Sequence, residues 1–439
     1  MHANRETPRQ RLLSAMVEVC AADGFERATV AMVIGHAGVS RRTFYRHFAS
    51  KSDCLLTAAA EIERRLLEST EAAVQKQTDS TIGVVIAALV MFAQERPGPA
   101  LVLMSETMAA GRAGLATRDH AVDRLAALGQ GVIDVDPADL GPPAGVLIGA
   151  LFRVLASRLR RGELDQQSLT DELVHWARSY EKPGAAEPVA ALTSTSTSAR
   201  TSVARRQLTA LRAPPAARAR RHKDPGDAVS EDQRLAVMFA LAEVVRRDGY
   251  PNATVAAITH SAGVDGRIFY ALFADKPGAL MALHEFAFQH AWAATAGGFF
   301  TAEDWPERIW QAAGTFTEFL DRNPILTYTS LVENAAGGPD ATRRFEELLA
   351  GFTIFLRDGY QYPATSGRRG PSPAALEAIA HADHEMLYRH ARADESARMG
   401  TLRGRLTYVC LSPFVGPEGA AALIAGLKPT APENEDRGR

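Results

Sequence analysis

Residues 40–48 gather side chains of the kinds that hold phosphate groups. They read Ser-Arg-Arg-Thr-Phe-Tyr-Arg-His-Phe, so basic and hydroxyl side chains surround two phenylalanines, Phe44 and Phe48, that stand four positions apart. On a helix this spacing puts both rings on one buried face and leaves the polar side chains outside. Hydroxyl groups, basic groups and the backbone N–H groups at a helix start are the usual partners of nucleic-acid phosphates. The stretch therefore predicts a short helix that can face nucleic acid.

Two further helices before this stretch are predicted to position it. The first has an apolar stripe of helical spacing between residues 9 and 22, and it ends at Gly24, because glycine tolerates the backbone geometry of a helix end. Thr29 stands where the N-cap of a short second helix belongs. Gly38 then supplies a tight turn, and Ser40 caps the third helix. Two short helices joined by a glycine turn and packed on a longer one form a helix-turn-helix.

The same pattern occurs again 225 residues further along the chain. Residues 9–55 match residues 234–280 without a gap, and about 20 of the 47 positions are identical, against roughly one in fifteen expected from composition. The shared residues include the glycines of both turns and the two phenylalanines. The two segments are therefore copies, which we call the first copy and the second copy.

The first copy resembles the N-terminal signature of the TetR/AcrR transcriptional regulators, from Thr29 through Phe48 to Lys51. The resemblance covers about 47 residues of the first copy and is weaker in the second. It implies contacts to base edges or the groove edge from Arg41, Arg42 and Thr43. It implies contacts to phosphates from Thr29, Ser40, Tyr45, His47 and Lys51. A basic arm would be added by Arg5, Arg9 and Arg11.

The second copy keeps the buried framework and loses most of the groups assigned to DNA. The residues that replace polar or basic ones are Asp265, Gly266, Ile268, Ala271 and Leu272. The groups that remain for a weaker contact are Thr254, Arg267, Tyr270 and Lys276. Residues 1–65 hold ten Lys and Arg against seven Asp and Glu, whereas residues 231–285 hold five against seven. Because phosphates are attracted by net positive charge, we expect weak or absent specific DNA binding by the second copy.

The rest of the chain shows helical periodicity broken by Pro and Gly and no strand-like alternation, which predicts an all-α fold of two tandem units. Each unit is expected to contain an N-terminal three-helix helix-turn-helix domain and a helical regulatory or dimerisation domain. Residues 183–230, rich in Pro, Ser, Thr and Arg, are expected to form a flexible basic linker. The expected helix-turn-helix domains are residues 1–52 and 231–277, and the expected regulatory domains are residues 53–182 and 278–430.

The two regulatory domains carry different apolar residues. By the resemblance, the last two helices of such a domain form a four-helix bundle with a partner. The residues suited to it are Val146, Leu147, Leu151, Phe152, Leu155, Leu169, Leu173, Val174 and Trp176. The second domain is rich in aromatic residues, namely Trp292, Phe299, Phe300, Trp305, Trp310, Phe316, Phe319 and Tyr328. These either line a pocket for a small molecule or fill a core, and core packing is favoured.

Other kinds of chemistry find little support in the residues. Three cysteines without metal-ligand spacing exclude a disulfide framework and a cysteine zinc site. The group His381, Asp383, His384 and Glu385 invites a metal, but Tyr388 stands where the H-E-x-x-H motif requires histidine. Motifs for a serine nucleophile, a phosphate loop or a dinucleotide are absent. We expect no enzymatic activity, no metal and no cofactor. A polar N-terminus and the lack of a long apolar stretch predict a cytoplasmic protein without a membrane segment.

These expectations describe a ligand-responsive repressor that binds double-stranded operator DNA mainly through the first copy and takes an unknown small-molecule effector. Two arrangements remain open: the halves pair within one chain as a pseudo-dimer, or two chains pair as a homodimer. The alternative from another functional class is a small-molecule sensor or interaction protein that keeps the fold without specific DNA binding.

Overall fold

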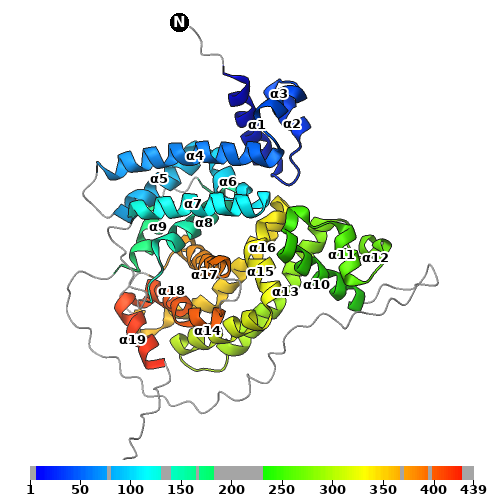
Figure 1. The fold of residues 1–439 in the computed structure, drawn as a ribbon. Helices are drawn as coiled ribbons and strands as arrows, with labels where there is room; N and C mark the ends of the chain where they lie inside the picture. The colour runs from blue at the N-terminus through cyan, green and yellow to red at the C-terminus, as the bar shows by residue number, and fades with distance from the viewer. Residues whose placement is uncertain are drawn as a thin grey trace, which may run out of the picture.

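The structure is a computed structural model that describes residues 6–76, 81–129, 140–164, 168–181, 231–365, 370–393 and 398–427. Over these residues the chain forms helices and no strand (Figure 1). The predicted all-α fold is therefore confirmed. No helix in these ranges is long and apolar enough to cross a membrane. The expected linker, residues 183–230, lies outside the described residues.

The first half of the chain, residues 6–181, begins with a three-helix unit that we call the first head. Its helices are α1 (Pro8–Asp23), α2 (Val30–Ala37) and α3 (Arg41–His47). The helices that follow are α4 (Lys51–Val74), α5 (Thr81–Glu95), α6 (Pro97–Met104), the 3-10 helix η1 (Glu106–Ala110), α7 (Arg112–Gly129), α8 (Ala144–Arg161) and α9 (Leu169–Arg178).

The second half, residues 231–427, begins with a unit of the same kind, the second head. Its helices are α10 (Glu231–Asp248), the short η3 (Tyr250–Asn252), α11 (Val255–Ala262) and α12 (Gly266–Leu272). The helices that follow are α13 (Lys276–Phe299), α14 (Trp305–Arg322), α15 (Pro324–Val332), η4 (Asn334–Gly337), α16 (Pro339–Ala350), η5 (Gly351–Gln361), η6 (Pro363–Thr365), α17 (Pro373–Ala393), η7 (Met399–Leu402), α18 (Arg403–Val415) and α19 (Pro417–Leu427).

Local capping sets the ends of the short helices in the first head. The Thr29 side chain accepts a hydrogen bond from the Met32 backbone N–H and starts α2. Gly38 ends α2 in the left-handed conformation, with φ of 60°, which glycine adopts without a Cβ clash. Ser40 then accepts from the Thr43 backbone N–H and starts α3. The N-caps and the turn predicted from the sequence are confirmed.

The second head repeats this construction. Thr254 caps α11, Gly263 ends it with φ of 67°, and Asp265 caps α12 by accepting from the Arg267 backbone N–H. Phe44 and its counterpart Phe269 are fully buried, and each belongs to the hydrophobic cluster of its own head. The residues shared between the copies are therefore mainly those that cap, turn or fill the three helices.

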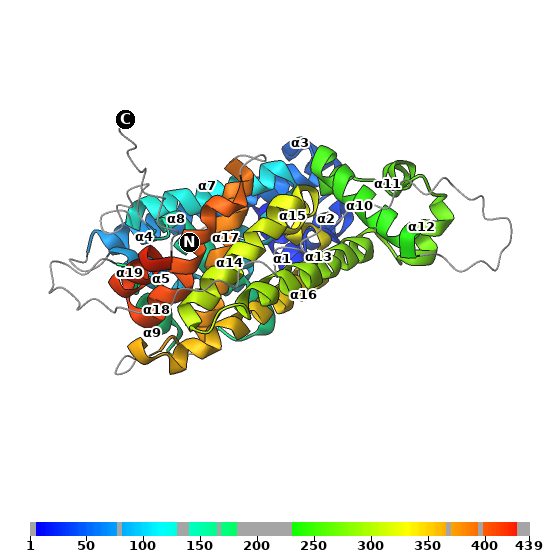
Figure 2. The same cartoon turned by 90° about the horizontal axis from the view of Figure 1, so that it is seen from below.

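The helices after the two heads pack into one body, with the heads on its outside (Figure 1). α8 of the first half lies along α17 of the second half (Figure 2), and α9 also contacts α17. The Tyr180 hydroxyl, just after α9, donates to the Val409 carbonyl of α18 at 3.0 Å. The residues predicted for a bundle are buried except Val174, which is half-buried. The last helices of the first half thus pack against helices of the same chain.

A buried charge cluster joins the halves where α8 meets α17. Glu385 of α17 accepts from Arg118 Nη1 and Nη2 of α7, at 2.5 and 2.9 Å, and from Arg153 Nε of α8 at 2.9 Å. Arg118 and Glu385 have no exposed side-chain surface. Burial opposes ionisation of Glu385, but the two guanidinium groups outweigh it and hold the pKa of Glu385 at about 2. Each charge is paired, as burial in a protein interior requires.

Helix boundaries differ from the sequence prediction at prolines and glycines. The sequence predicts a break at Pro97 and Pro99, but both lie in the first turn of α6, where the N–H that proline lacks would have no helical partner. The apolar periodicity of residues 339–358 predicts one helix, but this stretch divides at Gly351 into α16 and the 3-10 helix η5.

Candidate nucleic-acid interface

Helix α3 presents its basic side chains to solvent. Arg41, Arg42, Arg46 and His47 are exposed, and Phe44 on the opposite side is fully buried. Within the part of the chain that the structure describes, none of the three arginines of α3 makes an ion pair. Their charge is therefore available to an anionic partner. The sequence prediction assigned no contact to Arg46, although its position in the last turn of α3 exposes it as fully as the others.

An aromatic side chain supports one of these arginines. Tyr45 is 49% exposed, and the Arg41 guanidinium carbon lies 5.8 Å from the centre of its ring. The Tyr45 ring meets the buried Phe44 ring edge to face, at 5.3 Å between centroids. A planar guanidinium held near a ring loses less conformational freedom when it binds a base or phosphate.

The hydroxyl groups of the interface also serve as helix caps. Thr29 Oγ1 accepts from the Met32 N–H at 3.2 Å, and Ser40 Oγ accepts from the Thr43 N–H at 3.1 Å. The Ser40 and Thr43 hydroxyls lie 2.9 Å apart. Both caps are exposed, so the starts of α2 and α3 open to solvent with their unpaired backbone N–H groups, a favourable place for phosphate.

The Lys51 side chain is more buried than expected for a residue that contacts phosphate from the surface. Its Nζ donates to the Phe25 and Ala28 carbonyl oxygens, each at 2.8 Å, and stands 4.1 Å from the centre of the Phe25 ring. Burial lowers the pKa of Lys51. Lys276 repeats the arrangement with the Tyr250 carbonyl at 2.9 Å and the Tyr250 ring at 4.1 Å. The two lysines therefore tie the long helix after each head to the loop before the second helix, and this structural role explains their recurrence in both copies.

The basic arm predicted at the N-terminus is only partly described. Arg5 lies outside the described residues. Arg9 is exposed and stacks near Phe48, with its guanidinium carbon 5.9 Å from the ring centre. Arg11 Nη1 donates to the Ala37 carbonyl at 3.0 Å and so braces the end of α2. These two arginines extend the basic surface from α3 along α1.

The second head presents much less positive charge. Arg267 is the single arginine of α12, and its Nε lies 3.2 Å from Asp265 Oδ1. The backbone and side-chain hydrogen bonds from Arg267 lower the pKa of Asp265, which favours the carboxylate. Tyr270 is 63% exposed, and the position that corresponds to Arg41 on its helix is occupied by Gly266. The exposed face of α12 is therefore close to neutral. Thr254 and Lys276 remain, the first as a cap and the second as the tie described above.

The first head is attached to both halves of the body. The Phe25 backbone N–H donates to the buried Glu106 carboxylate of η1 at 2.9 Å. Arg27 forms an exposed ion pair with Asp340 of α16 at 2.6 Å. The position of α3 therefore depends on helices from each half.

The residues singled out as a possible metal site bind different partners. Glu385 binds the arginines described above, His384 Nε2 lies 3.1 Å from the Asn334 side-chain amide, and Asp383 Oδ2 accepts from the Cys410 thiol at 3.3 Å. In the described ranges, no three His, Cys, Asp or Glu side chains are grouped so that they could hold a metal ion.

Comparison with known proteins places the first head in a family. Residues 12–58 match the family described as bacterial regulatory proteins, tetR family. The chain is 36% identical over 63 residues to the HTH-type transcriptional regulator TcmR of Streptomyces glaucescens, covering 14% of this chain and 28% of that protein. It is 37% identical over 65 residues to an HTH-type transcriptional regulator of Mycobacterium tuberculosis, covering 15% and 33%. The chain thus spans about a third of the length of these curated relatives.

Solved structures show a more distant likeness. The regulator FadR from Bacillus subtilis, in complex with stearoyl-CoA, is 16% identical with a TM-score of 0.36, covering 41% of this chain and 98% of that one. A TetR-family regulator from Syntrophomonas wolfei is 18% identical with a TM-score of 0.35, covering 46% and 98%. By the family match, residues 12–58 are a TetR-type N-terminal helix-turn-helix domain.

Proposed function

We propose that the chain is a DNA-binding transcription regulator that reads operator DNA mainly through the first head. The observation that supports this proposal most is the set of exposed arginines on α3, which make no ion pair in the described part of the chain and belong to a TetR-type helix-turn-helix. A surface that only keeps a protein soluble is typically a mixture of both signs of charge. The absence of acidic residues from α3 favours an anionic partner.

The proposal gives each group a role. Arg41, Arg42 and Thr43 contact base edges or the groove edge, because the N-terminal part of a recognition helix enters the major groove. Phosphates are held by Thr29, Ser40, Tyr45 and His47. Lys51 contributes mainly by fixing the head, since two of its three N–H donors are already used. Weaker contacts are assigned to Thr254, Arg267, Tyr270 and Lys276.

We further propose that the chain is a fusion of two such units that pair with each other as an intramolecular pseudo-dimer. Residues 53–182 and 278–430 would be the two regulatory domains, joined through residues 183–230 and the second head. The packing of α8 along α17 supports this arrangement, as does the Arg118–Glu385 pair. A homodimer that used α8 would have to displace α17. The operator of such a pseudo-dimer would be asymmetric, with one strong half-site.

We expect the regulator to be a repressor that responds to a small-molecule effector. The proposal is tested first by selecting bound DNA from random or genomic fragments with the full chain. One strong half-site in the recovered sequences is the expected result, together with a solution mass of one 47.3 kDa chain by light scattering. A palindromic motif and a dimeric mass would overturn the pseudo-dimer.

The DNA contacts are tested by salt-dependent binding to the recovered sequence. Arg41→Ala/Arg42→Ala should weaken binding by about 1–3 kcal/mol for each arginine that contacts a base, whereas Arg267→Ala should change it little. Arg64→Ala/Arg65→Ala is the matched control, because it removes two exposed arginines from α4. Failure of the wild-type chain to bind any DNA above its non-specific level would favour the alternative, a sensor or interaction protein without operator binding.

A further inference from the structure

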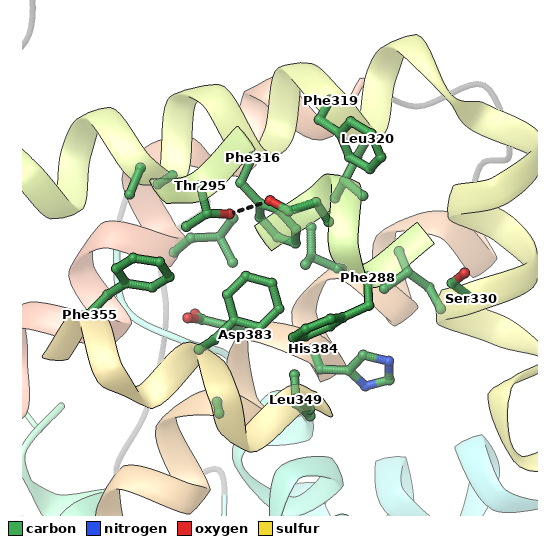
Figure 3. A pocket seen from close by; sticks show the side chains of 18 of the residues that line it. Phe288, Thr295, Phe316, Phe319, Leu320, Ser330, Leu349, Phe355, Asp383 and His384 are labelled. Carbon is green, nitrogen blue, oxygen red and sulfur yellow. Dashed lines mark hydrogen bonds between the residues drawn. The ribbon is translucent and has the colours of Figure 1, made fainter. Parts of the chain in front are cut away.

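A cavity of about 160 Å³ lies inside the second half, among α13, α14, α15, α16, η5, α17 and α18. Its walls are almost entirely apolar. Figure 3 shows Phe316, Phe319 and Leu320 on one side of it and Leu349, Asp383 and His384 on the other. Of the aromatic residues that the sequence predicted as core, Phe316 and Phe319 line the cavity. Phe319 also belongs to the hydrophobic core and Phe316 packs against it. Core packing, which the sequence favours, and the lining of a cavity are therefore both found at these two positions.

Several buried polar atoms in this apolar wall have no hydrogen-bond partner in the described residues, among them Asp383 Oδ1, Ser330 Oγ and His384 Nδ1. Asp383 is the carboxylic acid among them. Asp383 Oδ1 makes no hydrogen bond in the described structure, and its Oδ2 accepts only the weak thiol donor of Cys410. A carboxyl group so placed loses hydration without full compensation, which is costly unless a ligand supplies the missing donor. Burial accordingly raises the pKa of Asp383 to about 8.

The other ionisable groups of the wall do not supply positive charge. They are the imidazoles of His284 from α13 and His384 from α17 and the thiol of Cys410 from α18, which is never positively charged. Burial lowers the pKa of His284 to about 4 and lowers the pKa of His384 well below its usual value, so both imidazoles are neutral near pH 7. No Lys or Arg is among the residues that line the cavity. A carboxylate or phosphate ligand would therefore meet an acidic group and no cation.

We propose that this cavity is the effector site of the regulator and that it takes a small lipophilic amine, whose ammonium group binds Asp383. The regulatory role of this ligand rests on the proposed function. Its binding to Asp383 does not. Binding of an ammonium group releases the proton that burial keeps on Asp383 near pH 7. The ammonium then donates a charge-assisted hydrogen bond to the unpartnered oxygen and pairs with the carboxylate in a region of low dielectric. Cavities of roughly 150 Å³ bind benzene, so a ligand with one ring and a short amine-bearing arm fits the size.

The site is connected to the first half through α17. Asp383 faces the cavity, and Glu385, two residues further along the same helix, binds Arg118 and Arg153 of the first half. Arg118 belongs to α7, which packs against η1, and η1 provides the Glu106 carboxylate that holds the Phe25 N–H of the first head. A ligand that displaces α17 therefore acts on contacts that position α3.

The test uses four probes of similar shape on the full chain: 2-phenylethylamine, 2-phenylethanol, propylbenzene and phenylacetate. Calorimetric titration should show the amine binding at least about tenfold tighter than the alcohol, which corresponds to about 1.4 kcal/mol. Propylbenzene should bind more weakly still, and phenylacetate should not bind. Equal binding of amine and acid, or no amine binding at roughly 1 mM, would overturn the inference whatever any variant does.

A matched pair of variants locates the amine. Asp383→Asn should reduce the amine-to-alcohol ratio of affinities to about one and leave propylbenzene binding unchanged. Asp358→Asn, at an exposed carboxylate that pairs with Arg308, should keep the preference of the wild type. A preserved amine preference in Asp383→Asn would show that the ammonium binds elsewhere and would overturn the assignment.

Amine binding and operator binding can fail independently, and one experiment distinguishes the two outcomes. Operator binding is measured with and without saturating 2-phenylethylamine. A chain that binds DNA but not the amine keeps its role as a regulator and loses the site. A chain that binds the amine through Asp383 but no DNA keeps the site and supports the alternative of a small-molecule sensor.

Discussion

The two heads are alike in what they bury and different in what they expose. Phe44 and Phe269 occupy the same buried position, and Thr29 and Thr254 cap the same helix. On the outer face, the three arginines of α3 give way to a single arginine on α12, which is paired with its own N-cap. A duplicated sequence thus keeps its fold through the residues that fill and cap it. Binding chemistry on the surface is free to diverge, because its loss costs the fold almost nothing.

The largest effect that would test this contrast comes from the two buried phenylalanines. Phe44→Ala and Phe269→Ala should each destabilise their own head by about 3–5 kcal/mol, because each removes a fully buried ring and leaves a void. Hydrogen exchange, which resolves the two heads, measures the loss in each. Only Phe44→Ala should also abolish operator binding. Comparable loss of binding from Phe269→Ala would mean that the second head contacts DNA more than its surface suggests.

A somewhat smaller effect is expected from the two buried lysines. Lys51→Met and Lys276→Met each keep the apolar stem and remove the ammonium that binds backbone carbonyls of the preceding loop. Hydrogen bonds of this charged kind contribute about 1.5–3 kcal/mol, and Lys51 makes two while Lys276 makes one. Lys51→Met should therefore destabilise its head more than Lys276→Met does, as measured by hydrogen exchange. An unchanged stability in Lys51→Met, accompanied by weaker DNA binding, would return this residue to a phosphate contact.

The smallest effect is a gain of binding in the second head. Asp265→Ser/Gly266→Arg/Ile268→Thr copies the start of α3 onto α12, and a Cβ at position 266 meets open space. The test uses a chain that already carries Arg41→Ala/Arg42→Ala. We expect its DNA affinity at low salt to rise about tenfold. The slope of log affinity against log salt concentration should become more negative by the amount of about one phosphate contact. Fluorescence anisotropy over a salt series measures both. Gly266→Ser is the uncharged control, and a similar gain from it would refute the electrostatic explanation.

Much of the fold could be predicted because it is specified locally. Thr29, Gly38 and Ser40 set helix ends through contacts within a few residues, and apolar spacing identifies which side of a helix is buried. Because residues 234–280 repeat residues 9–55, the same helix ends and buried positions could be predicted for the second head. The candidate site on α3 could be predicted in the same way, because the positions of the buried phenylalanines determine which side chains of a short helix are exposed.

The remaining features depend on contacts between distant parts of the chain. Arg118 and Glu385 are 267 positions apart, and no local pattern pairs them. The position of Lys51 beneath Phe25 depends on how α4 meets the loop after α1. Likewise, Phe316 lines a cavity while Trp305 packs against Phe414, although both belong to α14. The difference arises from how α14 meets α17 and α18, which the spacing of aromatic residues does not encode.

The charge cluster between the halves has a consequence for how many chains assemble. Its fully buried carboxylate, Glu385, comes from the second half, and Arg118 and Arg153 come from the first. Arg118 also lies 3.5 Å from the carboxylate of Asp119 on its own helix. Two first halves brought together at this interface would bury these guanidinium groups without Glu385 and with only the half-buried Asp119 beside Arg118, which is electrostatically unfavourable. We therefore expect self-association of like halves to be unfavourable and pairing of the two unlike halves within one chain to be preferred.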